Sequence, residues 1–150
     1  MKKRHFSFIL LALLLALFGS QSVQAVQPIV HTLIPIGSDY RADTLQRFAQ
    51  AAAQRDSNGV VDLLVLPITY GTDALQTKNG ERNKNLSLAE NRRAQVEEAC
   101  NAVKLPTQSC HVVLAPVLIR SDAYLQSNLD LFVADLDGIY ILGGDQTIAM

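Results

Sequence analysis

The hydrophobic residues of this chain fall into separate runs that predict strands. Four such runs occupy residues 29–36, 60–68, 110–119 and 138–142. The last three are nearly continuous stretches rich in Val, Ile and Leu, which is typical of strands covered on both faces. Pro35, Pro67 and Pro116 lie late in the first three runs. Because proline lacks the N–H donor of a sheet ladder, each is expected to mark the point where pairing stops.

Helical patterns separate the apolar runs. Over residues 42–55 apolar side chains recur every three or four positions, which predicts an amphipathic helix that stops by Asn58-Gly59. A second helix is expected to open at Ser87, because Glu90 three residues later completes a capping box. Its expected apolar face consists of Ala89, Val96, Ala99, Cys100 and Val103.

A third helix is expected to start at Ser121 or Asp122. Its expected buried side chains are Leu125, Leu129, Phe132 and Val133, and a further helix is expected from Thr147. Strands and helices therefore alternate, which favours right-handed crossovers and a parallel sheet with helices on both faces. The connection at residues 69–86 is long and highly polar, so it is either a functional surface loop or a mobile one.

The first 25 residues differ in character from the rest. Lys2, Lys3 and Arg4 precede an uninterrupted apolar run at residues 9–18, and a short polar stretch at residues 19–22 leads to Val23-Gln24-Ala25. These are the three parts of a secretory signal. The apolar stretch is shorter than the roughly 20 residues that a membrane-spanning helix needs. We expect residues 1–25 to be a cleaved signal peptide and residues 26–150 to be exported to the periplasm or the extracellular space, with no membrane attachment after cleavage.

Composition and charge narrow the class of protein. The 150 residues are 49% hydrophobic and 18% charged, which argues against a disordered tail or a collagen-like repeat. Residues 1–25 hold three of the 13 Lys and Arg and none of the 14 Asp and Glu, so their removal leaves a net charge of −4. An acidic domain is a poor partner for nucleic acid. No metal or nucleotide cofactor is indicated, and dimerisation is left open.

The chain contains two cysteines, which are either joined by a disulfide or free. Cys100 falls near the end of a predicted helix and Cys110 at the start of a predicted strand, so the loop between them could bring the thiols together. Export would preserve such a disulfide. Alternatively both are buried apolar thiols, because free cysteine is among the most buried residue types. Their spacing fits neither a zinc site nor a redox motif.

The last strand runs into the most distinctive motif, Gly143-Gly144-Asp145-Gln146. Two glycines let the backbone approach a ligand closely, and successive amides at a helix start could stabilise an oxyanion. The alternative is a tight turn in which Asp145 caps a helix. A weaker candidate, Gly37-Ser38-Asp39, could also present amides to an anion or be only a turn with a cap, and it completes no nucleotide-binding motif.

The Gly-Gly-Asp-Gln ending of the segment at 138–146 resembles cyanophycinase and its relatives, the serine peptidases that include the aspartyl dipeptidase. Residues 112–118 with the following Arg120-Ser121-Asp122-Ala123, and residues 33–37, resemble other parts of that family. The resemblance implies a three-layer α/β/α sandwich with a mostly parallel sheet, of the class I glutamine amidotransferase (flavodoxin-like) type. The amides of Gly144 and Asp145 would match the oxyanion hole, and Gln146 a substrate-binding position. The substrate would be a peptide with aspartyl residues, including the β-linked aspartate-arginine polymer cyanophycin.

The chain departs from this family at the nucleophile. A Gly-x-Ser-x-Gly motif should follow Gln146, and none occurs in the 150 residues. His31 and His111 lie in predicted strands, where histidine is mostly structural, so no catalytic triad is assigned. We therefore expect an N-terminal fragment or truncated product of an exported peptidase. The alternatives are an aspartyl dipeptidase of the same fold and a non-catalytic exported α/β module that binds carboxylates.

Overall fold

The computed structural model describes residues 41–78 and 80–143. The chain divides into two units, Met1–His31 and Thr32–Met150, and every described residue belongs to the second. The predicted signal peptide, the strand at 29–36, the turn at 37–39 and the positions Gly144, Asp145 and Gln146 lie outside the described residues.

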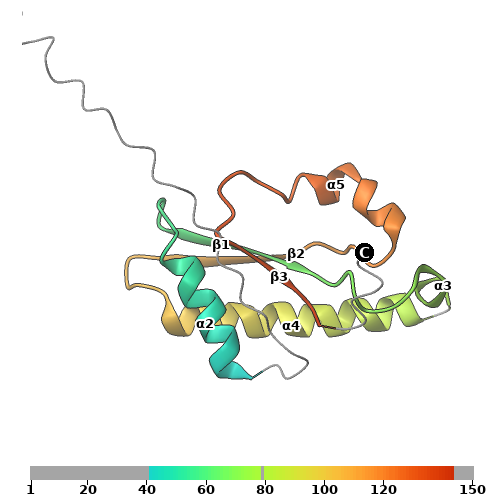
Figure 1. The fold of residues 1–150 in the computed structure, drawn as a ribbon, viewed down its shortest axis with the longest axis horizontal. Coiled ribbons are helices and arrows are strands. Elements are labelled where there is room, and N and C mark those ends of the chain that lie inside the picture. The colour runs from blue at the N-terminus through green and yellow to red at the C-terminus, as the bar shows by residue number, and fades with distance from the viewer. Residues whose placement is uncertain (1–40, 79, 144–150) are drawn as a thin grey trace, which may run out of the picture. The chain divides into compact units, whose positions relative to one another are not determined.

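Helices and strands alternate through most of the described chain (Figure 1). The elements are α2 (Ala42–Ala53), β1 (Val60–Leu66), α3 (Asp73–Gln76), α4 (Glu81–Val103), β2 (Ser109–Leu114), the 3₁₀ helix η1 (Arg120–Tyr124), α5 (Gln126–Leu129) and β3 (Gly138–Ile141). Pro67 directly follows β1, and Pro116 comes two residues after β2, so both prolines mark the end of pairing as predicted.

The three strands form a parallel sheet in the order β2-β1-β3. Leu64 in the central strand is flanked by Val113 of β2 on one side and Ile139 of β3 on the other. The prediction of a mixed α/β fold with a parallel sheet is confirmed. β1 is buried on both faces over Leu63–Leu66, which explains why its sequence is apolar at every position except Asp62 rather than alternating.

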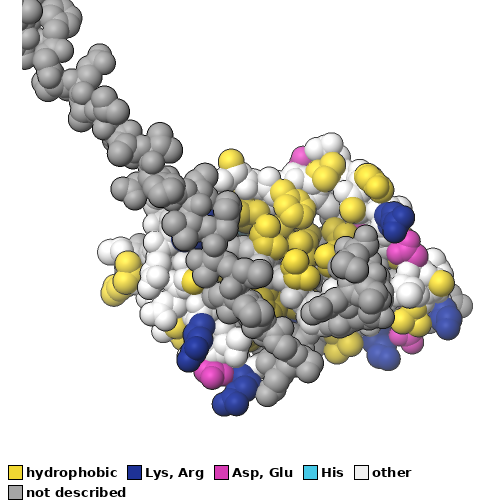
Figure 2. All heavy atoms as spheres, in the orientation of Figure 1, with side chains coloured by type: hydrophobic (Ala, Val, Ile, Leu, Met, Phe, Trp, Pro, Cys, Tyr) yellow, Lys and Arg dark blue, Asp and Glu magenta, His cyan; other side chains and the backbone are white. Residues whose placement is uncertain are grey.

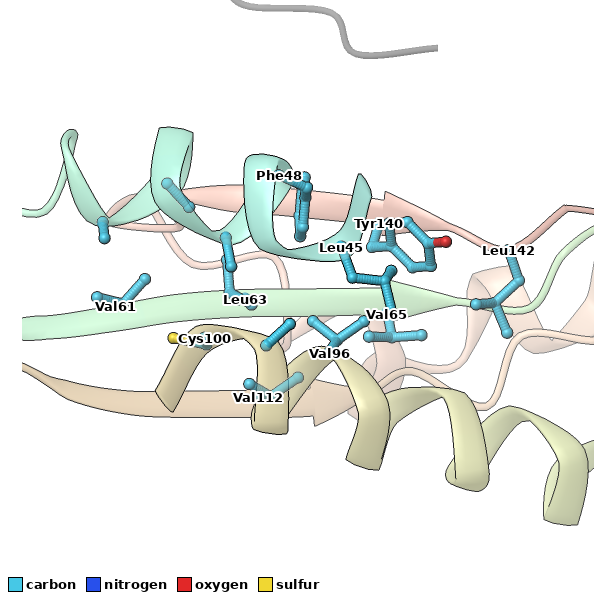
Figure 3. Close-up of a cluster of buried hydrophobic side chains, with 14 of the residues drawn as sticks. Leu45, Phe48, Val61, Leu63, Val65, Val96, Cys100, Val112, Tyr140 and Leu142 are labelled. Atoms are coloured by element: carbon cyan, nitrogen blue, oxygen red, sulfur yellow. The ribbon is translucent and has the colours of Figure 1, made fainter. Parts of the chain in front are cut away.

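One face of the sheet packs against α2 and α4 (Figure 3). Val61, Leu63 and Val65 of β1 lie in this core together with Phe48 of α2 and Val96 of α4. The spacing of apolar residues in α2 predicted this face, because Leu45, Phe48, Ala49 and Ala52 are all buried. Alternate residues of β1 point the other way, and Leu64 and Leu66 form a second, smaller cluster with Ala115 and Val117.

The predicted start of the second helix is wrong. Helix α4 begins at Glu81, so Ser87 and Glu90 lie inside it and form no capping box. Gly80 precedes the helix at φ 79°, a left-handed conformation that suits glycine. Residues after Gly80 are mostly good helix formers, and propensity extends the helix through a stretch whose polarity indicated a loop. Within the polar connection at residues 69–86, residues 73–76 form α3 and residues 81–86 belong to α4, so most of the connection is helical.

The expected third helix is also wrong. Its place is taken by η1 and the four-residue α5, and the side chains expected to be buried are exposed: Leu125, Leu129, Phe132 and Val133. The reason is local hydrogen bonding. The Asp122 carboxylate accepts from the N–H groups of Leu118 and Ile119, and Asn128 Nδ2 donates to the Asp122 carbonyl. Side chains that bond nearby backbone groups in this way favour a turn over a continued helix.

Cys100 and Cys110 form a disulfide, which decides between the two interpretations of these residues. Their Cα atoms are 6.2 Å apart, within the usual range for a bridged pair. The bond ties α4 to β2 and closes the short loop between them. Cys100 is fully buried against the core, so the bridge also fills space in it.

Gly138 of β3 lies against Phe48 of α2, and its replacement tests this packing. A Cβ atom there would lie 3.0 Å from Phe48 Cζ and 3.1 Å from Leu63 Cδ2. We expect Gly138→Ala to lower the free energy of unfolding by about 1–3 kcal/mol through overpacking, as measured by urea denaturation. In a double-mutant cycle Phe48→Leu should relieve part of this loss. Strict additivity of the two substitutions would rule out the steric explanation.

Candidate functional site

The carboxyl edge of the sheet is the place to look for a site. Ligands of open parallel sheets bind beyond the carboxyl ends of the strands, where the strand order reverses. Here β1 and β3 are neighbouring parallel strands, so their carboxyl ends meet at this edge. The segments that follow these two strands are joined directly. Leu142 N donates to Leu66 O at 2.9 Å, and the buried Thr69 hydroxyl donates to the Leu142 carbonyl.

The distinctive motif starts at this edge. Gly143, its first residue, comes two positions after the end of β3 and is half-buried. Leu142, immediately before it, is anchored through both its amide and its carbonyl. Of the motif residues, Gly143 alone belongs to the described chain, so the arrangement of Gly144, Asp145 and Gln146 stays a prediction.

An open polar pocket of about 500 Å³ lies near the same end of the strands. Its lining comes from the connection after β1, the start of α4 and the segment after β2: Gln76, Thr77, Lys78, Gly80, Arg82, Asn83, Ile119 and Asp122. In Figure 1 this is the end where α3 and the first turn of α4 lie, toward which the β1 arrow points. Lys78, Arg82 and the start of a 23-residue helix all favour a negatively charged ligand here.

Arg82 and Asp122 form an ion pair at the wall of this pocket, with 2.9 Å between Nη1 and Oδ2. Asp122 is 6% exposed. Burial alone would raise the pKa of its carboxyl group, but the hydrogen bonds from Arg82, Leu118 and Ile119 outweigh burial and lower the pKa below its ordinary value. Asp122 is therefore an ionised structural anchor, and it neutralises much of the charge of Arg82.

Lys78 is the more available cation. Within the described ranges no carboxylate lies at ion-pair distance from its ammonium group, whereas Arg82 is engaged by Asp122. A carboxylate ligand would gain a direct charge partner in Lys78 and polar neighbours in Asn83 and Arg82.

Two buried amide side chains contact each other at the pocket: Gln76 lines it, and Asn85 is hydrogen-bonded to Gln76. Asn85 Nδ2 donates to Gln76 Oε1 at 3.1 Å, and Gln76 is 2% exposed. Gln76 Nε2 is buried and has no hydrogen-bond partner among the described residues. Gly71 lies close to these groups at φ 147°, and a Cβ there would lie 2.7 Å from Leu75 Cδ2.

The polar composition of residues 69–86 indicated a functional surface loop as one alternative, but no sequence motif identified Lys78, Arg82 or Gln76 as pocket residues.

His111 has a structural contact. Its Nδ1 lies 2.7 Å from Asp62 Oδ1 on the adjacent strand, and the imidazole is mostly exposed. Ser87 is inside α4, Ser121 in η1 and Ser127 in α5. None of these three serines is hydrogen-bonded to His111, whose described side-chain contact is with Asp62.

The described residues contain no group of three or more His, Cys, Asp or Glu side chains that could hold a metal ion. None of the helices described is long and apolar enough to cross a membrane. No protein-family model matches the chain, and neither the curated proteins nor the solved structures include a significant match to it.

Proposed function

We propose that this chain is the N-terminal part of an exported serine-type peptidase of the cyanophycinase-like family. Its substrates would be peptides with aspartyl residues, such as those containing β-linked aspartate-arginine units. The complete fold would be a three-layer sandwich of the class I glutamine amidotransferase type. The nucleophilic serine would come from residues beyond these 150, because the sequence contains no Gly-x-Ser-x-Gly motif.

One observation carries the proposal: Gly143, the first residue of the Gly-Gly-Asp-Gln motif, follows β3 at the carboxyl edge of the sheet. The amide of Leu142 is held by Leu66 and its carbonyl by Thr69, so the residue that precedes the motif has a fixed position. In such a peptidase the amides of Gly144 and Asp145 would stabilise the oxyanion of the tetrahedral intermediate, and Gln146 would bind substrate.

The pocket beside α4 supplies a second support, because its charge fits the proposed substrate. An aspartyl peptide carries a carboxylate that a lysine can bind by a charge-assisted hydrogen bond. Lys78 offers that donor at the same end of the strands, whereas the charge of Arg82 is largely balanced by Asp122.

The same pocket favours a second candidate, a non-catalytic exported module that binds carboxylates. Binding at Lys78 needs no nucleophile, and the sequence provides none of the expected type. The gene separates the two functions. A peptidase requires a Gly-x-Ser-x-Gly segment after Gln146 in the same reading frame, with later histidine and acidic partners, and the binding module does not.

We expect the purified chain to bind a β-aspartyl-arginine dipeptide, measured by isothermal titration calorimetry. Lys78→Ala should weaken binding about tenfold, because one charge-assisted hydrogen bond is lost. Lys104→Ala is the matched control, since Lys104 follows the opposite end of α4 and donates to Gln108 O. Equal affinities of wild type and Lys78→Ala for the dipeptide would show that the dipeptide does not bind at Lys78 and would contradict the role proposed for this pocket. Absence of dipeptide binding by the wild-type chain would count against both functions.

A further inference from the structure

The turn between α2 and β1, residues 54–59, lies at the amino ends of the strands, at the opposite edge of the sheet from the candidate site. Its sequence Gln-Arg-Asp-Ser-Asn-Gly is polar, whereas the hydrophobic side chains in Figure 2 gather beside α5. Asn58 is exposed, and Gly59 after it is half-buried at φ 89°, in the left-handed region. The fold therefore favours glycine directly after an exposed asparagine.

An asparagine that precedes glycine has a reaction of its own. The main-chain nitrogen of the glycine attacks the side-chain carbonyl carbon of the asparagine, a five-membered succinimide ring closes, and ammonia leaves. Water then opens the ring at either carbonyl, which gives aspartate or the β-linked isoaspartate. Two groups would speed ring closure: a base that takes the proton of the attacking nitrogen, and a donor that stabilises the oxyanion on the asparagine side chain.

Both groups are in place at Asn58. The attacking nitrogen, Gly59 N, donates its proton to the Asp56 carboxylate in a hydrogen bond of 2.9 Å to Oδ1. The carbonyl under attack accepts from Val60, whose N–H lies 2.7 Å from Asn58 Oδ1. The base therefore lies at the nucleophile, and the donor lies at the oxygen that becomes negative.

Asp56 is held in this position from its other side. Its Oδ2 accepts from Gln108 Nε2 at 2.7 Å, and the same amide donates to Ala53 O at 2.8 Å. Burial alone would raise the pKa of Asp56, but the hydrogen bonds from Asn58, Gln108 and Gly59 outweigh it and lower the pKa below its ordinary value. The carboxylate is therefore ionised at neutral pH and able to accept a proton.

We propose that Asn58 is a site of self-catalysed succinimide formation, with Asp56 as the base and the Val60 amide as the oxyanion donor. The bond from Gly59 N to Asn58 Cγ forms, and the bond from Cγ to Nδ2 breaks. The proton of Gly59 N goes to Asp56, and the Nδ2 group takes up this proton and leaves as ammonia. One water molecule then opens the ring, and position 58 becomes aspartate or isoaspartate.

The modification changes the start of the sheet. Isoaspartate routes the chain through its side chain, which adds one carbon to the main chain before Gly59. Gly59 O accepts from Ser109 N at 3.0 Å, where the pairing of β1 with β2 begins. The amide of Ser109 should therefore exchange faster with deuterium in the isoaspartate form. The inference uses no residue of the candidate site, so it holds or fails independently of the proposed function.

The chain provides an internal comparison. Asn101 is also exposed, but it lies in α4, precedes Ala102, and donates through Nδ2 to Glu97 O. Trypsin places Asn58 and Asn101 in different peptides, residues 56–78 and 94–104, and the second Asn-Gly pair, at residues 79–80, in a third. Deamidation at each position can therefore be followed separately.

Mass spectrometry of these peptides during incubation at neutral pH tests the proposal, with electron-transfer fragmentation to distinguish aspartate from isoaspartate. We expect both products at Asn58 and none at Asn101. Asp56→Asn keeps an acceptor oxygen for the turn but removes the base. It should slow the reaction about tenfold or more, because a positioned base typically contributes about 10²–10⁴-fold. Asp130→Asn is the matched control, since Asp130 is exposed and belongs to the segment after α5, and it should leave the rate unchanged.

A synthetic peptide of residues 55–63 gives a second measurement that does not depend on how a variant folds. It has the same residues without the fold, and we expect it to deamidate more slowly than the folded chain. A peptide rate equal to or above that of the folded chain would overturn the proposal, because the turn would then give no assistance. Equal rates in wild type and Asp56→Asn, or an unmodified Asn58 in wild type, would overturn it as well.

Discussion

Asp122→Ala is expected to lower the free energy of unfolding by about 2–4 kcal/mol, because each buried donor left without its acceptor costs about 1–3 kcal/mol. The Asp122 carboxylate accepts from Leu118 N at 2.9 Å and from Ile119 N at 3.0 Å, and it pairs with Arg82. Urea denaturation at pH 7 measures the loss. Asp130→Ala is the control, because Asp130 is exposed and bonds only Gln126 among the described side chains.

The pH dependence of the same variant has a definite sign. The pKa of Asp122 is lower in the folded chain than its ordinary value of 3.8, which applies to the unfolded chain. Its contribution to stability is therefore complete above about pH 4 and disappears as the pH falls through the lowered folded value. We expect the stability difference between wild type and Asp122→Ala to shrink below pH 4. A difference that stays constant down to pH 2 would contradict the assignment of an ionised, hydrogen-bonded carboxylate.

Removal of the disulfide is the second large effect. The double variant Cys100→Ala/Cys110→Ala is expected to lose about 3 kcal/mol of stability, because opening a short loop returns conformational entropy to the unfolded chain. Thermal unfolding monitored by circular dichroism measures the shift in Tm. The reductant dithiothreitol should lower the Tm of wild type toward that of the double variant and leave the variant unchanged. A wild-type Tm that is insensitive to full reduction would show that the bridge does not stabilise the fold.

The disulfide also bears on where the chain functions. Such bonds persist in oxidising compartments and are rare in the cytosol of most organisms. Cys100–Cys110 is therefore compatible with the export proposed from residues 1–25.

Elements with strong, regular patterns were predictable from sequence. The apolar runs that became β1, β2 and β3 and the spacing in α2 led to the parallel α/β fold, and β1 and α2 are buried where the pattern requires it. The expectation that β3 is covered on both faces is wrong, because Ile139 and Ile141 are exposed and only Tyr140 between them is buried. The start of α4 was missed because polar residues after Gly80 indicate a loop by composition and a helix by propensity. The third helix was missed because the side chains of Asp122 and Asn128 bond nearby backbone groups and stop it early.

The candidate site was predictable only in its location. The rule for parallel sheets points to the carboxyl ends of the strands, and Thr69 does meet Leu142 there. The pocket could not be foreseen, because Arg82 and Asp122 are 40 residues apart and no spacing rule connects them. Their association depends on how the connections after β1 and β2 fold back over the sheet.

An NMR titration of the ¹⁵N-labelled chain with a β-aspartyl-arginine dipeptide tests the central claim most directly, because it maps the ligand onto the fold. We predict chemical-shift changes at Lys78, Arg82 and Gly143, at the carboxyl edge, with the amides of Val60 and Ser109 at the amino ends of β1 and β2 unaffected. Changes centred on Val60 and Ser109, or no changes at millimolar dipeptide, would contradict an aspartyl-peptide site at this edge.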